Sequence, residues 1–193
     1  MIGQEVLVLA GGGLRAGVAR KAADAYQRAF IEAYESHYTK LFAYVYSRVG
    51  NVELAKDLTA EVFEKAYVKG HSVREAAAYT TWLFMIAKNV VIGHYRRQKR
   101  DNNGMNRVKD SLWLSERPHD PEANTLRGEA VSNLLRHLKR LSNRDQELLA
   151  LKFEGELSYT EISRVLRLSE VNVRVSIFRA LKRLRSLMEE DGR

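Results

Sequence analysis

The stretch Leu157–Leu184, which reads LSYTEISRVLRLSEVNVRVSIFRALKRL, decides the fold of the C-terminal half of the chain. Ser158 and, three residues later, Glu161 form a capping box, which predicts the start of a short helix. Ser169 then caps a second helix, which we expect to run to about Glu190. Two helices joined by a turn of about three residues have the layout of a helix-turn-helix.

The second of these helices has two faces of different chemistry. The apolar face, which should pack on the preceding helix, carries Val173, Ile177, Ala180, Leu181, Leu184 and Met188. The opposite face carries Val171, Val175, Phe178, Arg179 and Lys182, with Arg174 on its flank. Arginines beside apolar groups suit guanine edges and thymine methyls in the major groove, and nearby cations suit phosphates. The cations expected at phosphates are Arg164, Arg167, Lys182, Arg183 and Arg185. This face therefore predicts DNA binding, with a protein partner as the alternative.

A linker divides the chain into two helical halves. Both prolines, Pro118 and Pro121, lie in a polar stretch without sustained helical periodicity. We therefore expect an all-α protein in which two small helical domains are joined by a flexible linker, the second being a four-helix domain with a helix-turn-helix. The predicted boundaries are 1–25 for an atypical, disordered extension, 26–100 for the first domain, 101–125 for the linker and 126–190 for the second domain. Helices from about Glu122 to Arg140, and from Ser142 to near Gly155, should precede the helix-turn-helix.

The first half should hold helices over about 22–48, 52–69 and 75–100. The last of these begins with an apolar run, residues 82–87, and ends in cations. Asn89, Gly93, Arg96 and Arg100 fall on one stripe, and Gly93 would fit a close approach of another backbone there. The aromatic residues Tyr79, Trp82 and Tyr95 alternate with these cations, as expected where bases stack and phosphates are neutralised. Trp82 and Phe84 also fit a buried core, and cations are favoured at any helix C-terminus.

The predicted helix at 52–69 has an acidic face in an otherwise basic protein. Its carboxylates are Glu53, Asp57, Glu61 and Glu64. Such a face fits docking to a basic protein partner. A solvated face balanced by Lys56 and Lys65 fits the spacing equally well.

Composition excludes several classes of function. The 193 residues carry a formal charge of +8, which favours an acidic partner such as nucleic acid, and contain no cysteine, which excludes disulfides and thiolate metal sites. The five histidines are scattered, so we expect no metal and no cofactor. No stretch is long and apolar enough to insert into a membrane, and we expect a cytoplasmic protein.

The N-terminal run at residues 6–15, VLVLAGGGLR, favours another class. It resembles the strand and glycine-rich loop of patatin-like lipid hydrolases, and a nucleotide-binding loop can begin in the same way. Neither a G-x-S-x-G nor a G-K-[ST] sequence follows. We therefore expect no catalytic activity.

Two longer stretches resemble the extracytoplasmic-function subfamily of sigma-70 factors. Residues 55–63, AKDLTAEVF, and 79–89, YTTWLFMIAKN, are similar to region 2 of that family. Asp120-Pro121-Glu122-Ala123 also recurs in its linker, and residues from Leu138 to Arg185 resemble region 4. The resemblance covers about residues 26–188, in order and with fitting spacing.

The resemblance implies an alternative sigma factor, which binds core RNA polymerase, recognises the −35 and −10 promoter elements and promotes DNA melting. It implies docking on the clamp and flap of core polymerase, contact with promoter DNA, and an anti-sigma factor as an inhibitor. The residues that it implies for core polymerase binding are Asp57, Leu58, Glu61 and Phe63. Those for the −10 element are Lys65, Tyr79, Lys88, Asn89, Arg96, Arg97 and Arg100. Those for the −35 element are Ser169, Asn172, Arg174, Val175, Phe178, Arg179 and Lys182.

The sequence departs from the family pattern at several positions. Ala60 stands where glutamine is common, and Arg167 and Val171 stand where glycine is usual in the turn. A left-handed arginine costs about 1–2 kcal/mol, so a different turn geometry is one expectation. A stand-alone helix-turn-helix regulator and a protein-binding adaptor are the alternative functions.

Overall fold

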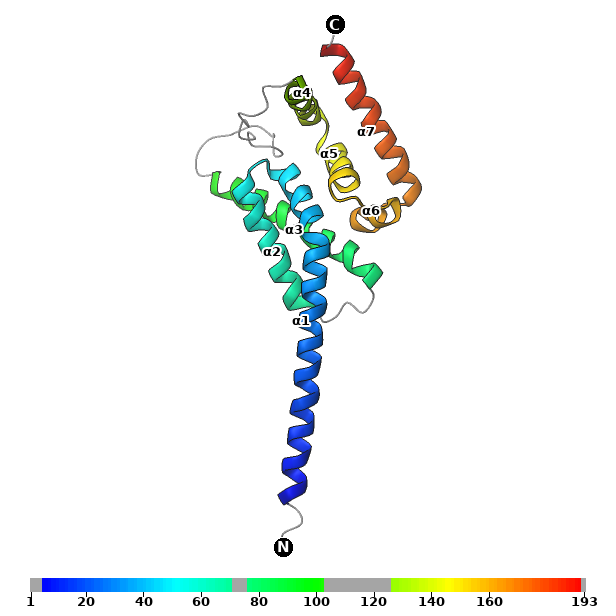
Figure 1. Ribbon diagram of the computed structural model, residues 1–193. Helices are drawn as coiled ribbons and strands as arrows, with labels where there is room; N and C mark the ends of the chain where they lie inside the picture. Colours follow the sequence, from blue (N-terminus) through cyan, green and yellow to red (C-terminus); the bar gives the residue numbers. More distant parts are fainter. Residues whose placement is uncertain (1–4, 71–75, 103–125, 192–193) are drawn as a thin grey trace. The chain divides into compact units, whose positions relative to one another are not determined.

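The computed structural model describes the backbone of residues 5–70, 76–102 and 126–191. Side chains are described for residues 24, 26–70, 78–100 and 133–191. Figure 1 shows the helices in chain order. They are α1 (Glu5–Val49), α2 (Val52–Lys69), α3 (Ala76–Asn102), α4 (Leu126–Arg140), α5 (Asn143–Leu149), the π-helical turn η3 (Ala150–Glu154), α6 (Tyr159–Leu166) and α7 (Glu170–Asp191). No strand occurs among the described residues, and the predicted all-α fold with two helical regions is confirmed. Most of the predicted linker lies outside the described residues.

The chain divides into two compact units, residues 1–37 and 38–193. The first contains most of α1, and its helix begins at Glu5, where we expected an extension without regular structure. Residues 14–49 contain no proline, so nothing in that stretch breaks the helical register. Among the described residues, no helix combines the length and apolar character needed to cross a bilayer.

Helices α2 and α3 pack on the end of α1 within the second unit. Gly50 takes a left-handed φ of 69°, and the Asn51 side chain then accepts a hydrogen bond from Leu54 N at 2.9 Å, which starts α2. The buried apolar side chains here include Leu41, Val45, Val49, Val62, Ala66, Leu83, Phe84 and Ala87. In the apolar run of α3, Trp82, Met85 and Ile86 are half-buried rather than fully enclosed.

The second half begins with α4 and α5. Ser142 caps α5 as predicted, because its Oγ accepts a hydrogen bond from Asp145 N at 3.2 Å. The helix predicted to reach Gly155 instead changes from α-helical to π-helical geometry at Ala150. A Cβ on Gly155 would lie 2.8 Å from Phe84 Cε1 and 2.9 Å from Leu151 O, so a larger residue does not fit there.

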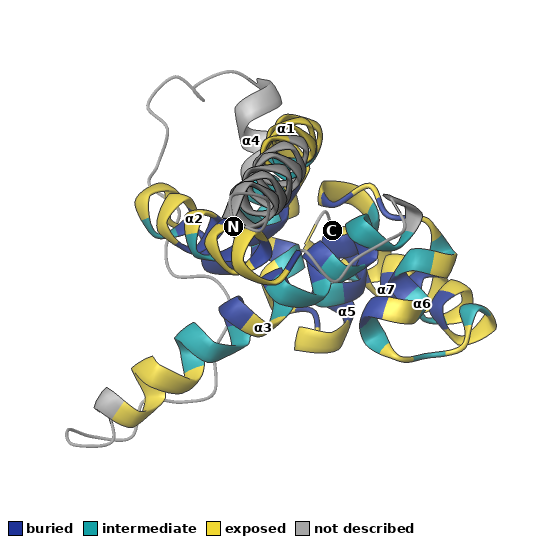
Figure 2. Ribbon diagram, turned by 90° about the horizontal axis from the view of Figure 1, so that it is seen from below, coloured by how far each residue is buried: buried dark blue, intermediate teal, exposed yellow. Residues whose placement is uncertain are grey.

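Helices α6 and α7 form the predicted helix-turn-helix. The Ser158 backbone N–H donates to Glu161 Oε2 at 2.8 Å, and Glu161 N donates to Ser158 Oγ at 3.2 Å, which confirms the capping box. Arg167 ends α6 with φ 55° and ψ 46°, so the turn keeps the left-handed geometry usually given to glycine. Ser169 Oγ accepts from Asn172 N at 3.2 Å and caps α7. In Figure 2, the buried positions of α5, α6 and α7 lie where these helices meet.

A buried polar cluster joins α1 to α5. The Tyr44 hydroxyl donates to Glu147 Oε1 at 2.8 Å, and Arg48 Nε lies 3.3 Å from Glu147 Oε2. Arg48 is 1% exposed, and its backbone carbonyl accepts a hydrogen bond from the Tyr95 hydroxyl at 2.9 Å. Burial, and then the charge of Glu147, raise the pKa of Tyr44 well above its ordinary value of 10.0. The phenol is therefore protonated at neutral pH.

Candidate nucleic-acid interface

Helix α7 presents the outward face that the sequence predicts. Val173, Ile177, Ala180 and Leu184 are buried against the rest of the domain. The seven residues predicted to contact the −35 element are all exposed: Ser169, Asn172, Arg174, Val175, Phe178, Arg179 and Lys182. Phe178 is 68% exposed, far more than a core phenylalanine would be. Leu181 and Met188, predicted on the buried stripe, are instead 40% and 42% exposed, because the buried face is narrower than the apolar stripe.

A surface hollow of about 1030 Å³ runs beside this face. Its lining includes Asn172, Val175, Arg179 and Lys182 of α7 and Arg140 and Arg144 of the α4–α5 corner. Of these two arginines, Arg140 is paired with Asp191, with 3.2 Å between Nη1 and Oδ1. Neither arginine was predicted from the sequence to bind DNA. The sequence shows only that cations end α4 just before the Ser142 cap. The fold brings Arg140 and Arg144 beside α7.

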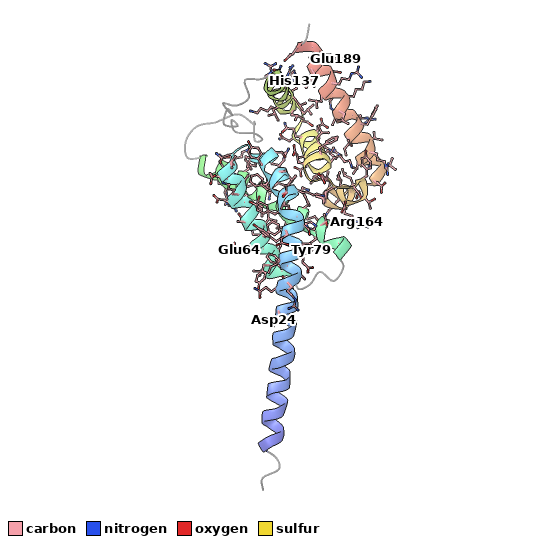
Figure 3. All side chains as sticks on the ribbon, viewed as in Figure 1. Asp24, Glu64, Tyr79, His137, Arg164 and Glu189 are labelled. Carbon is pink, nitrogen blue, oxygen red and sulfur yellow. The ribbon has the colours of Figure 1, made fainter. Side chains whose placement is uncertain are left out.

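Two of the cations expected at phosphates are held by carboxylates instead. Arg183 donates to both oxygens of Asp145, from Nε at 3.0 Å and from Nη2 at 2.6 Å. Arg185 Nε donates to Glu189 Oε1 at 2.7 Å. Arg164, labelled in Figure 3, is exposed on α6. Arg167, in the turn that follows, is also exposed. The cations left for phosphates therefore lie nearer the α6 end of α7 than the sequence predicted.

The end of α3 forms a second cationic surface. Asn89, Arg96 and Arg100 are exposed on it. A hollow of about 470 Å³ is lined by Gly93, Arg96, Arg97, Lys99 and Arg100. The backbone approach expected at Gly93 is not found among the described residues, where a Cβ added at Gly93 would meet only the Arg97 side chain, with Nη1 at 3.7 Å. Burial, and then Arg97, lower the pKa of His94 below 6.5, so its imidazole adds no charge at neutral pH.

The other predicted −10 residues are more constrained. Lys65 and Arg97 both form ion pairs with Glu61, the latter with 3.7 Å between Nη2 and Oε2. Lys88 and Tyr79 are half-buried. The Tyr79 and Trp82 rings lie 5.5 Å apart at an interplanar angle of 50°. Tyr95 is anchored to the Arg48 carbonyl through its hydroxyl, so it serves packing rather than an open stacking surface.

Helix α2 departs from the docking surface expected of it. Leu58 and Phe63 are each 4% exposed, so neither side chain lies on the surface of α2. Resemblance to a family identifies the positions but not their exposure, and here the two side chains complete the core with α3. Asp57 is exposed, whereas Glu61 is engaged by Lys65 and Arg97. Two apolar residues at the end of α2 also lie on the surface: Tyr67 is 45% exposed and Val68 is 69% exposed. Neither was predicted from the sequence.

Comparison with known proteins connects both surfaces to one family. Residues 33–101 match Sigma-70 region 2, and residues 132–184 match Sigma-70, region 4. The chain is 30% identical to the RNA polymerase sigma factor YlaC of Bacillus subtilis over 158 residues, which are 81% of this chain and 90% of YlaC. It is 28% identical to the ECF RNA polymerase sigma factor SigM of the same organism, covering 81% of this chain and 93% of SigM. It is 29% identical to the ECF sigma factor BldN of Streptomyces coelicolor, covering 86% of this chain and 62% of the length of BldN.

Solved structures show the same fold. The sigma factor RpoE, in complex with the anti-sigma factor NepR from Bartonella quintana, superposes with a TM-score of 0.65 at 21% identity, covering 84% of this chain and 98% of RpoE. CnrH, in complex with the cytosolic domain of CnrY, superposes with a TM-score of 0.58 at 23% identity, covering 90% of this chain and 96% of CnrH. The fold and the two ordered regions define a sigma-70 type factor, a class of non-enzymatic transcription initiation factors. Within that class, the chain belongs to the extracytoplasmic-function (ECF) sigma factors of RNA polymerase.

Proposed function

We propose that this chain binds core RNA polymerase and directs it to promoters through two separate DNA contacts, one made by α6–α7 and one by the end of α3. The observation that carries the proposal is that each helical half presents its own exposed cationic face, and that the two halves match region 4 and region 2. The chain has no G-K-[ST] phosphate loop. Strand opening is therefore driven by the binding of unstacked bases and single strand.

The upstream contact, at the −35 element, is assigned to α7. Its exposed Arg174 and Arg179 are suited to guanine edges, and Val175 and Phe178 to thymine methyls. Ser169, Asn172 and Lys182 complete the face, while Arg144 extends it along the phosphate backbone.

The downstream contact, at the −10 element, is assigned to the end of α3. Asn89, Arg96 and Arg100 form its exposed stripe. Lys65 and Arg97 lie beside it, held by Glu61, and Tyr79 and Lys88 are half-buried on α3. The role of Glu61 in this arrangement is to position two cations. Asp57 is then the acidic residue of α2 that is best exposed to reach core polymerase.

A charge reversal tests the docking assignment. Asp57→Arg should weaken the binding of the full-length chain to core polymerase, measured by gel filtration or fluorescence anisotropy. Glu154→Arg is the matched control, since Glu154 is an exposed carboxylate of the other helical half. Unchanged affinity for Asp57→Arg would overturn the docking assignment.

Abortive transcription with purified core polymerase tests the proposed function itself. A sigma factor makes core open promoter duplexes and synthesise short transcripts. A stand-alone regulator would bind DNA by itself and leave core inactive, and an adaptor would bind core without opening DNA. Either of the last two results would contradict the proposal.

An inhibitory protein partner and a cytoplasmic location are part of the same proposal. RpoE was solved in complex with the anti-sigma factor NepR, and CnrH in complex with the cytosolic domain of CnrY. We infer that this chain is likewise held inactive by an anti-sigma factor, and that it meets core polymerase, through the clamp and flap, in the cytoplasm. Co-purification of the chain from its native cells, followed by identification of the bound protein, tests the inhibitor.

A further inference from the structure

Arg174, one turn into α7, is held by a carboxylate on its own helix. Its Nε and Nη2 donate to Glu170 Oε1 at 3.2 Å and 2.6 Å. The other oxygen of Glu170, Oε2, accepts a hydrogen bond from Thr160 Oγ1 of α6 at 2.7 Å. The bonds from Arg174 and then from Thr160 hold the pKa of the Glu170 carboxyl below its ordinary value of 4.5, so it is ionised at neutral pH. The carboxylate thus ties Arg174 to the preceding helix of the motif.

An aromatic ring from α6 lies against the same guanidinium. Arg174 Cζ lies 4.5 Å from the centroid of the Tyr159 ring, a distance at which a cation is attracted to the ring face. Lys152 Nζ, 4.8 Å from the same centroid, also donates to the Leu157 carbonyl at 3.1 Å. The capping box at the start of α6 fixes the backbone just before Tyr159 and Thr160. Three side chains from two helices therefore set the position of Arg174.

These contacts leave one edge of the guanidinium open. Arginine has five N–H donors, and Glu170 takes the Nε–H and one N–H of Nη2. Within the described part of the chain, no other hydrogen bond to this group is found, and the side chain is 58% exposed. The open edge, formed by Nη1 and Nη2, offers two adjacent donors. Guanine presents two adjacent acceptors, N7 and O6, in the major groove, whereas adenine presents one acceptor and one donor.

We propose that Tyr159, Thr160 and Glu170 are positioning residues, which hold Arg174 so that its open edge reads one guanine of the upstream promoter element. The inference rests on the proposed function, because it requires α7 to lie in the major groove. Its physical basis is preorganisation: a mobile arginine would have to lose its rotamer freedom on binding, whereas this one is already ordered. Glu170, at the start of α7, therefore favours guanine at the position that Arg174 reads, although its charge repels the phosphates.

The test uses holoenzyme reconstituted from the full-length chain and bacterial core polymerase. The probe is a pool of promoter duplexes in which the upstream element is randomised, and sequencing of the bound fraction gives the base preference at each position. Arg174→Ala identifies the position that Arg174 reads, as the one where the guanine preference disappears. At that position alone, Glu170→Gln, Tyr159→Leu and Thr160→Val should each reduce the guanine preference by about 3- to 10-fold.

Matched variants separate positioning from a general effect of charge or folding. Tyr159→Phe keeps the ring and Thr160→Ser keeps the hydroxyl, so both should retain the preference. Glu189→Gln removes the same charge from the other end of α7, away from α6 (Figure 3), and should leave every position unchanged. Loss of charge at Glu170 should also strengthen binding to all sequences alike, which does not alter a base preference.

The outcomes distinguish this inference from the function on which it rests. If Arg174→Ala removes one guanine preference but Glu170→Gln, Tyr159→Leu and Thr160→Val all keep it within twofold, the positioning role is wrong and the sigma function stands. If Arg174→Ala alters no position of a sequence that the unaltered holoenzyme selects, the inference is again overturned. If the unaltered holoenzyme selects no upstream sequence, both the proposed −35 contact and the inference fail.

Discussion

Replacing Arg48 by methionine tests the buried cluster that joins α1 to α5. Arg48 is 1% exposed, and Glu147, its partner, is 13% exposed. Methionine fills much of the same volume but leaves the Glu147 carboxylate without a cation, while the Tyr44 hydroxyl still donates to it. Breaking one side of a buried ion pair typically costs about 3–5 kcal/mol. Because Glu147 keeps this hydrogen bond and some contact with water, we expect Arg48→Met to lower the free energy of unfolding by about 3 kcal/mol.

A double substitution sharpens this prediction. Glu147→Gln alone should also destabilise the chain, since it removes the carboxylate charge beside the buried Arg48 guanidinium. With both changes no charge remains, and the glutamine carbonyl can still accept from Tyr44. The double variant should therefore be more stable than the additive sum by about 2 kcal/mol, within the range seen for contacting residues.

Urea unfolding of the full-length chain, followed by circular dichroism, measures these differences. Lys40→Met is the control, because the Lys40–Glu156 pair has a shorter N–O distance, 2.7 Å, but its side chains are 48% and 61% exposed. An exposed pair of this kind contributes less than about 1 kcal/mol. If Arg48→Met lowers the free energy of unfolding no more than Lys40→Met does, or if the two changes in the double variant are strictly additive, the buried pair does not stabilise the fold.

Other substitutions test local features in the same urea titration. Gly155→Ala should destabilise the chain by about 1–3 kcal/mol, since its Cβ would meet Phe84. Gly93→Ala should instead stabilise α3 by about 1 kcal/mol, since its Cβ has room. If both variants change the free energy of unfolding in the same direction, this description of the packing is wrong. Arg167→Gly should raise the free energy of unfolding by as much as about 1 kcal/mol. Relief of the left-handed strain should outweigh the entropy that glycine adds to the unfolded chain. A lower urea midpoint would contradict that balance. The raised pKa of Tyr44 means that the folded chain keeps a proton which the unfolded chain loses above pH 10, so stability falls as the pH rises past that value. Thermal melts from about pH 9 to about pH 11 should show a steeper loss for the unaltered chain than for Tyr44→Phe, and parallel profiles would show that burial does not control this phenol.

The local signals in the sequence predicted the helix-turn-helix well. The Ser158–Glu161 capping box and the caps at Ser142 and Ser169 act over three residues, so they do not depend on the rest of the fold. Arg167 shows the opposite case. Its own preference disfavours the left-handed turn, but the packing of α6 on α7, in which Ile162 is fully buried, holds the turn in that geometry.

Features that depend on tertiary packing were less accessible from sequence. Helical periodicity assigned Leu181 and Met188 to the core, but only the neighbouring helices determine how wide the buried face is. Resemblance to a family placed Leu58 and Phe63 in a docking surface, although both complete the core. The Glu170–Thr160 contact crosses the turn between α6 and α7, and no pattern within either helix predicts it.

The proposed function requires that this chain, bound to core polymerase, opens promoter DNA by contacting the DNA at two places. Permanganate reactivity of unpaired thymines, on a duplex chosen by the reconstituted holoenzyme, measures this most directly. We predict reactive thymines near the −10 element only when chain and core are both present, and loss of that reactivity when either Arg174 and Arg179 or Arg96 and Arg100 are replaced by alanine. If thymines stay unreactive toward permanganate when chain and core are both present and no inhibitor is bound, the chain does not open promoter DNA.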